Sequence, residues 1–116
     1  MRTPRFRPAL AAATATVLAL AAAGVAAEPE PNEKYTLNCV ACHGADLRGV
    51  EGLGVSLVGS PFVAGTATPA LVEFLKAGRM PDDPASVSGR PMLGFAWIPE
   101  AELVEIAEYV KRQNGG

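Results

Sequence analysis

The 116-residue sequence is short of the side chains from which most protein metal sites are built. It contains two cysteines and one histidine, whereas a closed structural zinc site usually needs four Cys or His ligands. It also lacks the βαβ pattern that surrounds a thioredoxin-like redox disulfide, and there is almost no strand signal of any kind. These shortages argue against a zinc site and against a thioredoxin-type dithiol.

Positive charge is scarce as well. The formal net charge is −2, and three of the ten basic residues lie within the first seven positions. No cluster of lysine and arginine predicts binding to nucleic acid or to an anionic membrane surface. Internal repeats are absent too, so the length predicts one domain.

The first 27 residues have the organisation of a secretory signal peptide. Three arginines form a basic start, residues 9–23 are an uncharged run rich in Ala, Leu and Val, and residues 25–27 are small, as a cleavage site requires. We expect cleavage after Ala27 and a periplasmic domain over residues 28–116, not inserted in the membrane. The alternative is an uncleaved leader that anchors the protein. Cleavage removes three basic residues and no acidic ones, so the domain would have a formal charge of −5.

Both cysteines and the histidine lie together in the stretch Cys39-Val40-Ala41-Cys42-His43. C-x-x-C-H is the attachment pattern of a c-type haem, in which each sulfur adds to a vinyl group and the histidine supplies an axial nitrogen. In a helical turn, residues i, i+3 and i+4 share one face, so all three side chains can face one flat ligand. The sequence predicts one haem c per chain, tethered by Cys39 and Cys42, with His43 bound to the iron.

The rest of the domain predicts short helices joined by long loops. Helices are expected over residues 33–42, 69–77 and 99–113, the first capped by Asn32 and the second by Thr68.

Two loops separate these expected helices. Residues 46–60 are rich in glycine, which predicts an irregular loop packed on a flat cofactor because glycine lets the backbone approach a ligand closely. Within it, Arg48 is a candidate partner for a haem propionate, although an exposed arginine is the commoner outcome. Residues 80–91 are expected to form a second long loop.

The sixth iron ligand cannot be a second histidine of the same chain. Methionine is the remaining strong candidate, and Met1 would leave with the leader. Met92 is preferred because it lies in an apolar turn just before the last helix. Met80 is the second choice, since it precedes two aspartates in a more solvated setting. An open sixth position, which would allow small-ligand chemistry, is the third possibility.

From residue 28 onward the sequence resembles a small monohaem class I c-type cytochrome. The matching features are Tyr35-x-x-Asn38-Cys39-x-x-Cys42-His43-Gly44, Leu57-x-Gly59, residues 74–79, Met92, and a terminal helix with Tyr109. The resemblance implies an all-α, cytochrome c-like fold of three to five short helices and long loops wrapped around one covalently attached haem. It implies that the last helix packs across the first at Tyr109. It also implies Met92 as the distal ligand, because in that family the methionine precedes the helix aromatic by about the same interval.

The sequence departs from the family pattern at three places. Asn32 stands where a glycine is common at the helix crossing, and Pro99 replaces the usual Ser or Thr cap of the last helix. The family usually has a proline before the leucine, with a carbonyl that accepts a bond from the axial histidine. Here Val55-Ser56 precede Leu57, so we expect a different carbonyl to orient His43.

The resemblance implies an electron carrier without catalytic residues, either a soluble shuttle or the cytochrome subunit of a respiratory or dehydrogenase chain. Its partners would be redox proteins: a donor dehydrogenase or quinol-oxidising complex, and an acceptor oxidase or reductase. The alternative is a five-coordinate haem enzyme or gas sensor, for which the distal loop offers Ser88, Arg90 and Trp97. A third hypothesis is a secreted redox or scaffold module without haem.

Overall fold

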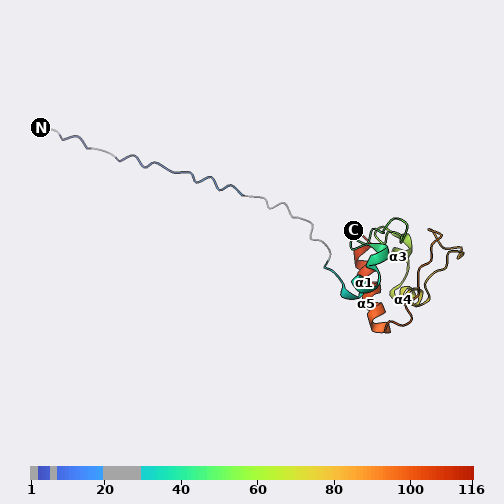
Figure 1. Cartoon of the computed structure of the whole chain (residues 1–116). Helices are drawn as coiled ribbons and strands as arrows, with labels where there is room; N and C mark the ends of the chain where they lie inside the picture. The colour runs from blue at the N-terminus through green and yellow to red at the C-terminus, as the bar shows by residue number, and fades with distance from the viewer. Residues whose placement is uncertain (1–2, 6–7, 20–29) are drawn as a thin grey trace.

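The computed structural model describes residues 3–5, 8–19 and 30–116. The described residues form five helices in the order α1 (Glu33–Asn38), α2 (Val40–His43), α3 (Pro61–Gly65), α4 (Thr68–Ala77) and α5 (Glu100–Gln113) (Figure 1). The same residues contain no strand, only isolated bridges between Val50 and Gly54 and between Arg79 and Met92. This helical content agrees with the predicted all-α class.

The predicted leader is only partly described. Residues 8–19 have neither helix nor strand and are exposed, whereas the expected cleavage site at residues 25–27 lies outside the described residues. In the described part of the chain, no helix is long and apolar enough to cross a membrane. The leader and its cleavage therefore stay predictions.

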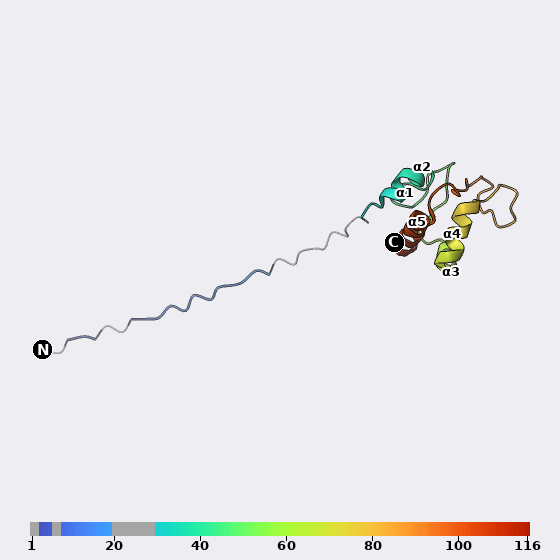
Figure 2. The ribbon, with the colours of Figure 1, turned by 90° about the horizontal axis from the view of Figure 1, so that it is seen from below.

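Helix α5 forms the centre of the folded part, between α1 on one side and α4 on the other (Figure 2). Its apolar stripe includes Leu103, Ile106 and Ala107, which are at most 2% exposed. Burying a leucine or isoleucine side chain stabilises a fold by about 1.5–3 kcal/mol. The i, i+3, i+4 pattern thus predicted both the helix and its buried face.

The predicted crossing of the last helix over the first is confirmed. The rings of Tyr35 in α1 and Tyr109 in α5 have their centroids 5.3 Å apart, a separation typical of a favourable aromatic pair. The hydroxyl of Tyr35 also donates to the Gly44 carbonyl oxygen at 2.7 Å, and burial raises the pKa of that hydroxyl. Tyr35 therefore ties the end of α2 to the α1–α5 crossing.

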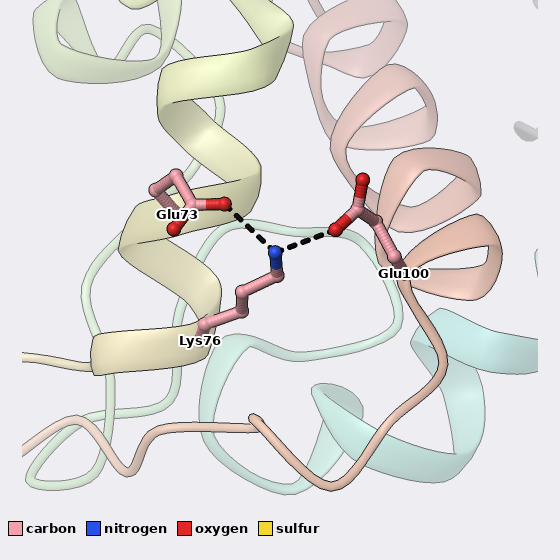
Figure 3. Close-up of polar contacts among 3 residues, drawn as sticks. All are labelled: Glu73, Lys76 and Glu100. Carbon is pink, nitrogen blue, oxygen red and sulfur yellow. Dashed lines mark hydrogen bonds and ion pairs between the residues drawn. The ribbon is translucent and has the colours of Figure 1, made fainter.

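Ion pairs join the helices at the surface. Lys76 of α4 contacts Glu73 at 2.7 Å and Glu100, the first residue of α5, at 2.6 Å (Figure 3). Lys34 of α1 contacts Glu102 of α5 at 3.0 Å. Because ion pairs at the surface are screened by solvent, these contacts contribute little to the stability of the fold.

Two helix boundaries and one additional helix differ from the sequence prediction. The expected helix over 33–42 is broken at Cys39, which has φ −122° and ψ −26°. Thr68 lies inside α4 instead of capping it, and Ala67 is the N-cap without a side-chain bond. Helix α3 was not predicted, although Ser60 caps it and Pro61 is its first residue, which is the usual signal for a helix start.

Candidate haem attachment site

The C-x-x-C-H motif forms a single helical turn. Cys39 is the N-cap of α2, and Cys42 and His43 lie within α2. The backbone N–H of His43 donates to the Cys39 carbonyl oxygen at 2.9 Å. The break at Cys39 therefore preserves the backbone turn between Cys39 and His43, while the shared face of the three side chains stays a prediction.

The two cysteines are free thiols in different surroundings. Cys39 is 7% exposed, whereas Cys42 is exposed. Burial, together with the nearby Cys42, raises the pKa of the Cys39 thiol to about 11. A metal ligand or nucleophile must be a thiolate, so the surroundings of Cys39 favour the protonated thiol over that form.

His43 is held by one hydrogen bond from its ring. It is 8% exposed, and its Nδ1 lies 2.8 Å from the Val55 carbonyl oxygen. A carbonyl only accepts, so Nδ1 must bear the proton, and in the neutral imidazole the lone pair of Nε2 is then available. This is the arrangement by which histidine ligands are oriented toward a metal. The carbonyl that the sequence could not identify therefore belongs to Val55.

The glycine-rich loop over residues 46–60 packs closely on the motif. The backbone N–H of Gly49 donates to the His43 carbonyl oxygen at 2.8 Å, and that of Val50 donates to the Cys42 carbonyl oxygen at 3.1 Å. A Cβ added at Gly54 would collide with that same carbonyl oxygen and lie 2.8 Å from its carbon. The expectation of an irregular loop is confirmed, and its glycine lets backbone meet backbone at Cys42.

We expect the substitution Gly54→Ala to destabilise the protein with haem attached by about 1–3 kcal/mol, the usual cost of forcing an extra methyl into a filled site. The obstacle is the backbone of Cys42, which cannot rotate away as a side chain can. Thermal unfolding would measure the loss. Gly65→Ala is the matched control, because a Cβ there meets no atom within 4 Å. Equal melting temperatures for the two variants would contradict the expectation.

The two candidate methionines differ in burial. Met92 is partly buried and packs against the hydrophobic core, whereas Met80 is 64% exposed. The backbone of Met92 is held by two hydrogen bonds to Arg79, at 2.9 and 2.8 Å. The preference for Met92 over Met80 as the distal ligand stays a prediction.

Several large apolar side chains that follow the motif in the sequence are exposed. Large apolar side chains in the loop over 46–60 and in the segment over 80–97 are exposed, among them Leu53 at 53%, Leu93 at 74% and Trp97 at 73%. Exposed apolar side chains of this size are available to a binding partner or cofactor. Whether these side chains cover a haem stays a prediction.

Two arginines make contacts between separate segments that the sequence did not indicate. The side chain of Arg90, in the distal loop, donates to the Gly52 carbonyl oxygen, which ties the distal loop to the loop over 46–60. Arg79 stacks on two aromatic rings. Arg48 is exposed, and its backbone N–H donates to Asp46 at 3.1 Å, so its role toward a propionate stays a prediction.

A comparison with known proteins supports a c-type cytochrome. A protein of Corynebacterium diphtheriae named cytochrome bc1 complex cytochrome c subunit is 34% identical over 90 residues, which cover 75% of this chain and 28% of that protein. The chain thus spans little more than a quarter of the relative's length. No family model matches the sequence, and no solved structure does.

Proposed function

We propose that this chain transfers single electrons on one haem c, attached through Cys39 and Cys42 and ligated by His43 and Met92. The observation that supports this most directly is the 2.8 Å contact between His43 Nδ1 and the Val55 carbonyl oxygen. With the proton on Nδ1, Nε2 would be free to bind iron beside the two cysteines of the C-x-x-C-H turn. The similarity to a cytochrome c subunit supports the same role.

The residues of the site would hold and tune the haem, and the haem would supply a one-electron couple at its iron. Cys39 and Cys42 would tether it at one edge, and His43 would bind one axial position. The thioether of Met92 would bind the other and raise the reduction potential relative to two histidines. Electron transfer of this kind needs neither an open iron position nor a proton-handling side chain.

We propose further that the mature protein works in the periplasm between redox proteins. The predicted leader supports export, and the relative is named as a subunit of a bc1 complex. The donor would be a quinol-oxidising complex or a dehydrogenase, and the acceptor an oxidase or reductase. The protein would be either a free shuttle or a subunit of such a complex.

A visible spectrum of the protein matured in a periplasm, with and without carbon monoxide, tests the proposed site. We expect a low-spin haem whose oxidised form shows the weak far-red band of methionine on iron, and whose reduced form is unchanged by the gas. A high-spin spectrum that shifts with carbon monoxide would instead mean an open sixth position and would favour a haem enzyme or gas sensor.

A further inference from the structure

Arg79 lies where α3, α4 and the segment of Met92 meet. Its guanidinium carbon is 4.9 Å from the centre of the Phe62 ring in α3 and 4.7 Å from that of Phe74 in α4. The two rings are themselves 4.8 Å apart, edge to face. A cation within about 6 Å of a ring is attracted by it, and only 19% of the Arg79 side chain is exposed. The side chain is therefore fixed against two helices at once.

The backbone of the same residue holds Met92. The N–H of Arg79 donates to the Met92 carbonyl oxygen at 2.9 Å, and the N–H of Met92 donates back at 2.8 Å. Three residues later, the N–H of Phe95 donates to the Leu75 carbonyl oxygen in α4 at 2.8 Å. The segment over 92–95 thus runs along the end of α4. Its first residue, Met92, is bound to the backbone of Arg79.

The guanidinium nitrogens of Arg79 also make polar contacts. Its Nη1 donates to the Ala85 carbonyl oxygen at 3.1 Å, and its Nε lies 3.9 Å from the carboxylate of Asp83. A planar guanidinium can stack on rings and donate from its rim at the same time, which a lysine ammonium cannot do. One side chain therefore joins two helices to the loop over 80–91.

From these contacts we propose that Arg79 is a positioning residue that holds the Met92 segment in place on the distal side of the haem. The inference rests on the proposed function, in which Met92 is the distal ligand. An outside ligand can replace a thioether only if the segment bearing it moves away. Anchoring through Arg79 opposes that movement, so its loss should make the iron easier to reach.

The test is the substitution Arg79→Gln in the protein with haem attached. We expect the affinity of the oxidised protein for imidazole to rise about tenfold, equivalent to about 1.4 kcal/mol. Hydrogen exchange at the Met92 amide, followed by NMR, should quicken by a similar factor while haem content stays unchanged. Arg112→Gln is the control, because it removes the same charge from an exposed position in α5.

Two milder variants test the aromatic contacts. Phe62→Leu should raise the imidazole affinity by a smaller factor, and the double variant with Arg79→Gln should fall short of the product of the two effects, since both remove the same contact. Arg79→Lys should lie between wild type and Arg79→Gln. Because Phe62 is 38% exposed, its replacement keeps the test valid even if Arg79→Gln does not fold.

The outcomes separate this inference from the proposed function. Imidazole affinity and Met92 exchange within twofold of wild type in both Arg79→Gln and Phe62→Leu would overturn the role of Arg79. If the wild-type iron already binds carbon monoxide, but Met92 exchange still quickens in Arg79→Gln, the ligand assignment fails. The anchoring of the segment by Arg79 is then supported.

Discussion

The double substitution of Cys39 and Cys42 by alanine is expected to leave no haem on the polypeptide after denaturation and extraction with acidified organic solvent. Wild-type protein should retain all of its haem under the same treatment, because two thioether bonds survive unfolding. The double variant should retain no covalently bound haem at all, since the chain has no other cysteine. Absorbance of the extracted polypeptide, together with its mass, measures the result.

The single substitutions show how the two tethers differ. Cys42 is exposed and Cys39 is buried, so Cys42→Ala should retain haem on one bond with little loss of packing. Cys39→Ala should also retain one bond but lose more stability, because it leaves a space in the core. Haem that stays with the extracted double variant would disprove attachment at the motif.

The sequence predicted the features of the fold that depend on local patterns. The stripe of Leu103 and Ile106 placed α5 to within a residue, and Asn32 was predicted as the cap of α1. The side chain of Asn32 does accept a bond from the Tyr35 N–H at 2.9 Å. Such signals need only a few neighbouring residues, which is why they can be recognised without a structure.

Features that depend on contacts between distant residues were missed. The partner of His43 is a backbone carbonyl 12 positions away, and any residue of the loop could have supplied one. Arg79 was noted only as part of a matching segment, because Phe62, one of its two aromatic partners, lies in a helix that was not predicted. The sequence alone does not indicate that an arginine and two phenylalanines from three separate segments stack on one another.

The break at Cys39 has a different cause. The expected continuous helix over 33–42 rested on spacing, which is satisfied equally by one helix or by two with a bend between them. In the structure, Cys39 ends α1 by donating its N–H to the Tyr35 carbonyl oxygen at 2.8 Å and begins α2 by accepting from His43. Haem attachment needs only the turn from Cys39 to His43. The motif therefore predicts that turn and does not predict whether the residues before Cys39 continue the same helix.

The substitution Met92→Leu is expected to lower the reduction potential by on the order of 0.1 V, a modest part of the range of about 0.8 V that axial ligands span. Leucine preserves the volume of the side chain, so the packing of Met92 against the core is largely kept. What is lost is the thioether, which favours the reduced iron. Redox titration followed by absorbance measures the shift.

Met80→Leu is the matched control, because it makes the same change in the same region at a side chain that is 64% exposed. Its potential should stay close to wild type and its far-red band should persist, whereas Met92→Leu should lose the band and bind carbon monoxide when reduced. The opposite pattern would assign the distal position to Met80. In that case Met80 would be the ligand. The two hydrogen bonds between Arg79 and Met92 would then hold the residue that directly precedes the ligand in the chain.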